Sequence, residues 1–522
     1  MSARLQQLLE ILALSEHSHY LTGIRRGIEK ECLRINADGT LAQSSHPPGL
    51  GSALTHQNIT TDFSEAQLEL ITPVSTDITW TLNYLEDIHR FIYSQLDGDR
   101  LWLSSMPCFI EEEGPIPIAQ YGSSNIATMK TVYRKGLSLR YGSVMQTISG
   151  IHYNFSLPDE FWPFYQKLWN DEQNLQAFKN KAYFSLIRNF RRYSWLLVYL
   201  FGASPVICKS FLQGQPHTHT LTPFDENSLC APYGTSLRMS DLGYQSQAQN
   251  ELIISYNSLD EYIQILDAAM KTSYEPYEVW GVKDVGDYRQ LSTCLLQIEN
   301  EFYNPIRPKR VTRTGEKSLK ALHERGVEYV EVRCLDVNPF LPLGIDARQI
   351  RFLDTFLLYC LLYDSPESNH EEHRDIVSNL KNVVNRGRDP TLVLRDVSHE
   401  VSMTNWAKSL LNNIQPIAEI LDDSHDSSSY RESIQQLLKA MDPEQTPSAS
   451  ILRQMRDQKS PYFKFTINKC HEHEVYLRET ALSADKMKHF QRMTEQSLID
   501  QITLEEKDTL HFDAFLANYF NQ

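Results

Sequence analysis

The sequence predicts an α+β protein whose sheet is mainly antiparallel. Segments with alternating or β-branched residues indicate strands at 23–35, 67–72, 146–156, 293–303 and 327–337. Long connections separate them, which is typical of an antiparallel sheet with helices and not of a regular βαβ repeat. Beyond about residue 365 the chain changes to helices with charged faces. We therefore expect a catalytic core over 1–365 and a helical C-terminal region, 366–522, packed on it.

Helices are predicted wherever apolar residues recur every three or four positions. In the first two-thirds these segments are 5–12, 78–96, 174–200, 258–272 and 347–363. In the C-terminal region they are 370–385, 404–422, 430–441 and 483–500. The polar stretch 422–429 between two of them is interpreted as a solvated loop.

Composition narrows the class of protein. The formal net charge is −16, which argues against a general nucleic-acid binder. Eight scattered cysteines without a Cys-x-x-Cys pair favour a reducing cytosol over a disulfide framework. The longest apolar run, 195–207, is too short to span a bilayer. We expect a cytoplasmic protein that binds neither nucleic acid nor membrane and that works as a monomer.

Two acidic residues one position apart are the most informative feature of the chain. In an extended strand Glu29 and Glu31 point to the same side, about 6.5 Å apart at the backbone. Two inward carboxylates must be protonated, paired with arginine or bound to a metal ion. Three more strand-like segments supply candidate partners for them.

Asp62 and Glu69 belong to the first of these segments, which taken alone also fits a half-exposed strand with solvated acids. His152 lies in the second, although a lone strand histidine is more often structural than a ligand. Glu331 and Arg333 share a face in the third. They form either a simple ion pair or a metal ligand beside a phosphate-binding guanidinium.

The chain has no Gly-x-x-x-x-Gly-Lys-Ser/Thr loop and no Gly-x-Gly-x-x-Gly motif. A nucleotide would therefore be held through metal ions and arginines on the sheet. Carboxylates from several strands suit Mg²⁺, and a histidine among them would also accept Mn²⁺. The basic cluster 307–310 offers charge for a polyphosphate, and it also fits a solvated turn.

Five segments, in this order and spacing, resemble one known family: 27–31, 61–65, 145–154, 236–244 and 307–310. The family is bacterial glutamate–cysteine ligase (γ-glutamylcysteine synthetase) of the monofunctional proteobacterial type, and the similarity runs from about residue 20 to 360. The resemblance implies a glutamine-synthetase-like fold, in which an antiparallel sheet forms a cradle for ATP, metal ions and glutamate. It implies ligation of the γ-carboxylate of L-glutamate to the amine of L-cysteine through γ-glutamyl phosphate, the first step of glutathione biosynthesis. Feedback inhibition by glutathione is a further expectation.

The resemblance also implies roles for individual residues. One magnesium ion would be held near glutamate by Glu31, Asp62 and Glu69, and another, at the ATP phosphates, by Glu29, His152 and Glu331. Arg333 would grip the transferred γ-phosphate, and Arg238 a charged group of the substrate or intermediate. The remaining expected substrate-binding residues are Phe63, Tyr133, Gln146, Ser149, Tyr244 and Tyr303.

Two other functions stay open at this point. One is a γ-glutamyl ligase of the same fold that uses another amine. The other is an inactive protein that binds glutamate or nucleotide as a regulator, because fold alone does not establish activity. Cys32 and Cys334 flank expected ligand positions on the opposite faces of their strands, and we interpret both as core packing.

Overall fold

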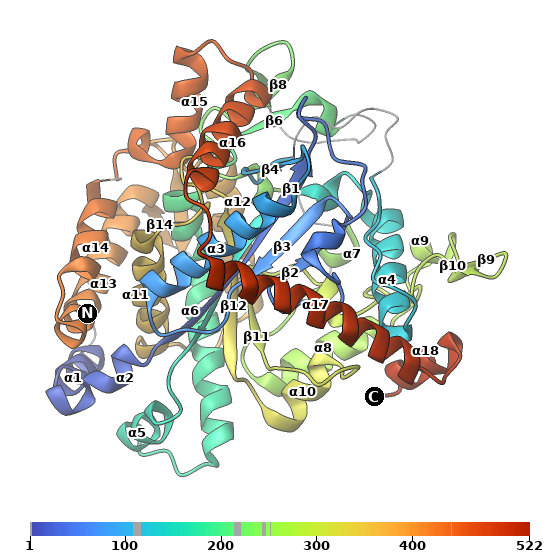
Figure 1. Cartoon of the computed structure of the whole chain (residues 1–522). Coiled ribbons are helices and arrows are strands. Elements are labelled where there is room, and N and C mark those ends of the chain that lie inside the picture. Colours follow the sequence, from blue (N-terminus) through green and yellow to red (C-terminus); the bar gives the residue numbers. More distant parts are fainter. Residues whose placement is uncertain are drawn as a thin grey trace.

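A computed structural model describes residues 3–107, 116–212, 221–242, 247–250, 252–397, 399–439 and 441–522. Its centre is a seven-stranded antiparallel sheet (Figure 1). Six strands follow the order β11-β12-β5-β1-β3-β2, and β4 pairs with the end of β1. Their bounds are β1 (Arg25–Ile35), β2 (Ile59–Thr61), β3 (Gln67–Ile71), β4 (Arg100–Trp102), β5 (Gly150–Ser156), β11 (Ile306–Lys309) and β12 (Tyr329–Asp336). The predicted α+β class with an antiparallel sheet is confirmed.

Three small sheets lie outside this one. They are built from β6 (Val206–Cys208), β7 (Thr222–Pro223) and β8 (Ser228–Cys230), from β9 (Lys283–Asp284) and β10 (Asp287–Tyr288), and from β13 (Val393–Asp396) and β14 (His399–Ser402).

Helices surround the sheet. Those of the first two-thirds of the chain are α1 (Ala3–Leu12), α2 (Ser18–Thr22), α3 (Ile78–Gln95), α4 (Asn125–Tyr141), α5 (Phe161–Leu168), α6 (Leu175–Phe201), α7 (Gln247–Asn250), α8 (Leu259–Lys271), α9 (Glu275–Glu278), α10 (Ser318–Arg325) and α11 (Ala347–Leu362). The later ones are α12 (His370–Arg386), α13 (Met403–His425), α14 (Ser429–Lys439), α15 (Pro447–Asp457), α16 (Tyr462–Glu479), α17 (Ala484–Lys507) and α18 (Phe512–Phe520). All the helices predicted from periodicity are present, with shifted ends. The sequence analysis missed the remaining helices of the described residues: α2, α4, α5, α7, α9, α10, α15, α16 and α18.

Alternation along the strands divides the sheet into two faces. Lys30 of β1 points to the face covered by α3, where its Nζ lies 2.8 Å from Nε2 of His89. On the same face the Tyr153 hydroxyl of β5 donates to Asp354 of α11 at 2.5 Å. Helix α6 packs on α11, β11 and β12. Glu29 and Glu31, the neighbours of Lys30, therefore point to the opposite face.

The predicted strand 293–303 is wrong. This segment contains a 3₁₀ turn, Glu299–Glu301, and the sheet gains β11 only at Ile306. Glutamate side chains here bond to backbone amides in place of a neighbouring strand. Glu299 accepts from the Ser318 amide at 2.6 Å, and Glu301 accepts from the Gln297 amide at 2.5 Å. Because side chains satisfy these backbone groups, alternation here does not mark a strand. Likewise, the strand predicted over 146–156 begins only at Gly150.

The interpretation of 422–429 as a solvated loop holds only for residues 426–428 and is wrong for the ends of this range. Helix α13 continues to His425, and Asp422 in its last turn is fully buried. The Asp422 carboxylate accepts from the amides of Tyr430 and Arg431, both at 2.9 Å, and pairs with the Arg431 side chain at 3.0 Å. These donors compensate the buried charge and join α13 to α14.

Helices from the C-terminal region pack against earlier elements. Phe490 of α17 stacks on Phe91 of α3, and α17 then crosses the molecule toward α18, which packs on α4 (Figure 1). The boundary at residue 365 stays a prediction. Within the described residues, no helix combines the length and the apolar character needed to cross a bilayer.

Candidate active site

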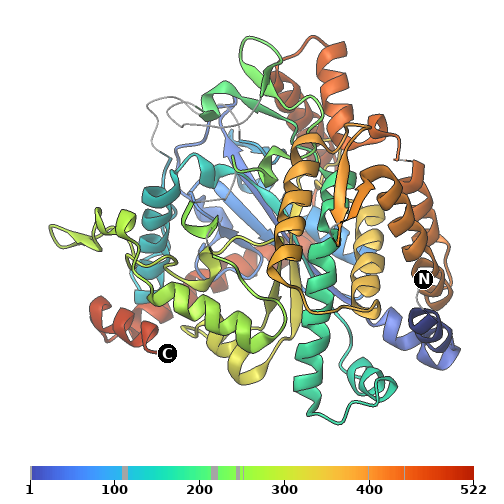
Figure 2. The same ribbon diagram turned by 180° about the vertical axis from the view of Figure 1, so that it is seen from behind.

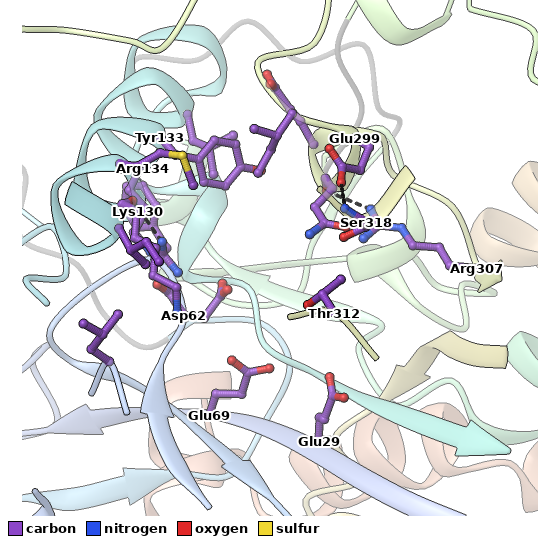
Figure 3. Close-up of a pocket in the computed structure, with 18 of the residues that line it drawn as sticks. Glu29, Asp62, Glu69, Lys130, Tyr133, Arg134, Glu299, Arg307, Thr312 and Ser318 are labelled. Carbon is purple, nitrogen blue, oxygen red and sulfur yellow. Dashed lines mark hydrogen bonds between the residues drawn. The ribbon is translucent and has the colours of Figure 1, made fainter. Parts of the chain in front are cut away.

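An acidic cavity of about 800 Å³ lies over the open face of the sheet. Its floor carries all six residues that the sequence analysis expected to bind metal: Glu29, Glu31, Asp62, Glu69, His152 and Glu331. They come from four strands and from the turn after β2, so segments far apart in sequence meet here. Figure 3 shows Glu29, Asp62 and Glu69 rising from the sheet below Lys130 and Tyr133.

The strand register brings three of these residues together. Glu29 lies opposite His152 in the β1–β5 pair, and Glu331 lies opposite Asn154 in the next pair. His152 Nδ1 is 3.3 Å from Glu29 and 3.7 Å from Glu331. Of the described residues, these three form the one group whose possible ligand atoms all lie within 4.8 Å of one another. Glu331 Oε2 is buried and accepts no hydrogen bond, and the Arg333 guanidinium lies 3.2 Å from it.

The second expected set of metal ligands, Glu31, Asp62 and Glu69, consists of carboxylates only and is not part of this close group. Glu31 and Glu69 are register partners across β1 and β3. Burial, followed by the charges of Glu29, Asp62 and Glu31, holds the pKa of Glu69 well above its usual range. Burial and Asp62 also raise the pKa of Glu31, whose carboxylate accepts from the Gly150 amide at 2.6 Å.

Cations from β11 and β12 balance one side of this floor. Arg333 Nη1 lies 3.2 Å from Glu331, and Lys309 Nζ lies 3.6 Å from the same carboxylate. Burial alone would raise the pKa of Glu331, but Lys309 and Arg333 outweigh it and hold that pKa well below its usual range. Glu331 is therefore ionised, and Arg333 is held directly beside the Glu29–His152–Glu331 group.

The sequence analysis missed most of the cavity wall. Helix α4 contributes Lys130 and Arg134 beside the expected Tyr133, and burial lowers the pKa of Lys130 to about 8. The opposite wall includes Glu299, Arg307 and Thr312 (Figure 3), and α17 and α18 add further residues, including Asp500, Leu504 and Tyr519. The spacing of Lys130, Tyr133 and Arg134, three and four apart on one helix face, was the available signal.

The expected substrate-binding residues divide into three groups. Phe63, Tyr133, Gln146 and Tyr303 line the cavity. Ser149 and Arg238 are buried and do not line it: Ser149 Oγ accepts from Gln67 at 3.3 Å, and Arg238 Nη2 donates to the Arg333 carbonyl at 2.9 Å. Tyr244 lies outside the described residues. Arg238 thus supports the strand that carries Arg333.

The two flanking cysteines pack in the core, as expected. Cys32 and Cys334 are buried, and burial raises their pKa to about 11 and about 12. Neither thiol is ionised near neutral pH. All seven cysteines within the described residues are free.

The fold and the cavity define an ATP-dependent ligase, and the comparisons with known proteins name its kind. The chain belongs to the glutamate–cysteine ligase family, whose model matches residues 9–383. It is 49% identical over 512 residues to a glutamate–cysteine ligase of Saccharophagus degradans, covering 97% of this chain and 96% of that one. It is 50% identical over 520 residues to one of Pseudomonas paraeruginosa, covering 99% and 98%.

Solved structures agree with this assignment. A glutamate–cysteine ligase of Francisella tularensis in complex with AMP superposes with a TM-score of 0.90 at 35% identity, covering 96% of this chain and 98% of that one. A bifunctional glutathione synthetase of Pasteurella multocida shares the fold, with a TM-score of 0.73 at 24% identity over 93% of this chain and 58% of that one. The chain therefore joins glutamate to cysteine at the expense of ATP, the first step of glutathione synthesis.

Proposed function

We propose that the acidic cavity binds ATP and glutamate together and that the chain activates the γ-carboxylate as γ-glutamyl phosphate before cysteine attacks. The observation that carries this proposal is the convergence of Glu29, His152 and Glu331 directly beside Arg333. Two anionic substrates cannot share one cavity unless cations offset their repulsion. The cavity combines anionic ligands for metal ions with a guanidinium for a phosphate.

The residues fit divalent cations. Carboxylate oxygens suit Mg²⁺, the imidazole would also accept Mn²⁺, and one possible ligand atom from each of Glu29, His152 and Glu331 lies within 4.8 Å of the others. We assign Glu29, His152 and Glu331 to a cation at the ATP phosphates, and Glu31, Asp62 and Glu69 to one near glutamate. Bound there, the cations would neutralise charge on the triphosphate and on the carboxylate.

The chain's own cations position the transferred group. Phosphoryl transfer depends mainly on alignment and charge neutralisation. Arg333 is held by Glu331 in front of it and by the bond from Arg238 to its carbonyl behind it. We propose that this guanidinium orients the γ-phosphate, whose oxygens match its planar fork. Lys309 and Arg307 extend the positive charge along the same wall.

Phe63, Tyr133 and Tyr303 are aromatic residues of the cavity lining, and we assign them to the side chain of cysteine. The thiol is recognised there, while the free amine is the nucleophile that attacks the activated carbonyl. Selection by size is modest, about 10- to 200-fold for a methylene-sized change. We therefore expect the enzyme to accept close analogues of cysteine at reduced kcat/KM.

An ADP-release assay tests this proposal. With ATP and glutamate fixed, cysteine should stimulate ADP release far more than other amines do, and Glu331→Gln should abolish the stimulation. Glu160→Gln makes the same chemical change at an exposed position outside the cavity and should behave as wild type. Faster release with a different amine would assign the chain to another γ-glutamyl ligation. Binding without ADP release under all conditions would assign it to regulation.

Two expectations accompany the assignment. We propose that one chain is the working unit, because the six expected metal ligands and Arg333 already meet in one cavity within it. We also propose that glutathione inhibits by occupying the cavity. Light scattering at assay concentrations tests the first expectation. Inhibition by glutathione that is competitive with glutamate would support the second.

A further inference from the structure

A second cavity, of about 470 Å³, shares Tyr303 with the active-site cavity. Helices α6 and α12 pack against each other (Figure 2). Both contribute to the wall of the cavity, together with residues 252–256 and 302–305. Much of the lining is apolar, including Met239, Ile254, Phe302, Ile376 and Leu380. Apart from Tyr303, none of the residues assigned above to the reaction lines this cavity.

Arg191 of α6 places a buried positive charge in the wall of this cavity. Its side chain is 9% exposed, and its guanidinium lies over the Tyr256 ring at 4.3 Å. Its polar partner is Nδ1 of His373, at 3.2 Å. No carboxylate of the described residues lies within ion-pair distance of Arg191, since the neighbouring Glu372 is paired with Arg192 at 2.6 Å.

Nothing in the lining neutralises this buried cation. His373 is neutral, because burial and then Arg191 lower its pKa to about 4, and its ring supplies no negative charge. Arg374 and Lys381 add positive charge to the lining, and Asp241, an acid of the same lining, lies 3.3 Å from Lys381. In a chain of net charge −16, this is a locally positive and partly apolar cavity. Glu372, outside the lining, favours the charged form of Arg191 only from beyond ion-pair distance and is shared with Arg192, so a bound anion would stabilise this buried charge further.

We propose that this cavity binds a small organic anion: a carboxylate pairs with Arg191 while an attached apolar group packs against Ile254, Phe302 and Leu380. The planar guanidinium suits a carboxylate. The volume is in the range of small-molecule sites, about 300 to 1,000 Å³. An anion without an apolar group would leave most of the lining without contact, and a neutral apolar compound would leave Arg191 uncompensated.

The occupant would be coupled to the active site through a shared wall. Tyr303 and Gln249 line both cavities. The Tyr303 amide donates to Gln249 Oε1 at 3.1 Å, and Gln249 Nε2 donates to the Glu301 carbonyl at 2.9 Å. An anion beside Tyr303 therefore changes the wall assigned to cysteine. This kinetic part rests on the proposed role of Tyr303, whereas binding itself does not.

Calorimetric titration of the full chain without substrates tests the binding. The probes are phenylbutyrate, its neutral analogue phenylbutyramide, and acetate, which lacks the apolar group. We expect phenylbutyrate to bind and the other two to bind about 10- to 100-fold more weakly. Arg191→Gln should remove the preference for the acid over the amide.

A second variant keeps the test independent of the buried arginine. Val377 is 48% exposed and lines the cavity, so Val377→Trp should block phenylbutyrate without disturbing the core. Val393→Trp, at a similarly exposed valine of β13 outside the cavity, is the matched control and should bind as wild type. Equal binding of acid and amide, unchanged binding by Val377→Trp, or no binding at millimolar phenylbutyrate would overturn the proposal.

The kinetic arm uses the same probe. Phenylbutyrate should change the KM for cysteine in wild type and in Val393→Trp but not in Val377→Trp, with the KM for ATP unchanged. If phenylbutyrate binds and the KM for cysteine stays constant, the site stands and the coupling through Tyr303 is rejected. An enzyme that is inactive with cysteine would reject the proposed function and leave the calorimetric result standing.

Discussion

Glu31 and Glu69 lie directly opposite each other in the register of β1 and β3, so two acids share a cross-strand position at the floor of the cavity. Side chains paired in this way have Cβ atoms about 5 Å apart, and like charges there are destabilising. The raised pKa of Glu69, caused by burial and then by Glu29, Asp62 and Glu31, is a direct consequence. The folded protein therefore holds these two side chains in an arrangement that disfavours the ionised form of Glu69.

Removing one of these charges should stabilise the protein without metal. We expect Glu69→Gln to unfold at a higher temperature than wild type in EDTA. Magnesium should stabilise wild type more than the variant, because a ligand that binds the folded state contributes about 2.7 kcal/mol at 100 times its Kd. Thermal unfolding with EDTA and with Mg²⁺ measures both effects. A lower unfolding temperature for the variant in EDTA would contradict the electrostatic explanation, and Glu160→Gln should change neither value.

Arg333 should act on the rate and not on substrate binding. We expect Arg333→Ala to lower kcat about 100- to 1,000-fold, the size typical of losing one preorganised transition-state contact, with a much smaller change in the KM for glutamate. Arg333→Lys keeps the charge but loses the planar fork, so it should recover part of the rate. Steady-state kinetics with a near-normal kcat for Arg333→Ala would remove this residue from the mechanism.

Glu29 should set the magnesium requirement. Its burial favours protonation, but the hydrogen bond with His152 and the charge of Lys309 outweigh that effect and lower its pKa, so a carboxylate faces the site. Glu29→Gln should need a higher Mg²⁺ concentration for half-maximal activity, by about 10-fold or more. A magnesium titration that superimposes on that of wild type would reject Glu29 as a ligand.

The sequence predicted the acidic floor well because strand alternation is a local property. The period of two along each strand predicted which face Glu29, Glu31 and His152 occupy. The resemblance to the family then predicted that their segments meet in one site. Helix α4 was missed for a physical reason: its Lys130, Tyr133 and Arg134 face a polar cavity, so no apolar stripe marks the helix.

The strand wrongly predicted at 293–303 has a different cause: an alternating pattern is present here, but the segment does not form a strand. Its alternating acids accept backbone hydrogen bonds from Ser318 and Gln297, which are contacts that no local pattern encodes. The same holds for Asp422, whose burial depends on donors from the next helix.

Gly150 should be intolerant of any side chain. A Cβ at this position would lie 2.0 Å from Arg238 Nη2, the atom that donates to the Arg333 carbonyl. Gly150→Ala should therefore displace Arg238, lower stability by about 1 to 3 kcal/mol and lower kcat. Wild-type kinetics and stability for Gly150→Ala would show that Arg238 is not confined as described.

Acid should destabilise the protein through His56. Nδ1 of His56 accepts from the amides of Asn58 and Ile59, at 3.1 and 3.0 Å, so the folded ring is held neutral. Burial lowers its pKa from 6.5 to about 4. Between these values the unfolded chain binds the additional proton, so this stability is present above pH 6.5 and is lost as the pH falls toward 4. A fall of about 1.5 pH units from the upper end of this window removes about 2 kcal/mol of folding free energy for one histidine.

We expect His56→Asn, whose side-chain oxygen can accept the same amides, to lose less stability than wild type when the pH falls from about 6.5 to about 5. Urea unfolding midpoints at the two values measure the difference. His399→Asn, at an exposed position of β14, is the control and should follow wild type. If the midpoints of wild type and His56→Asn fall in parallel, other groups cause the acid sensitivity and His56 is not its source.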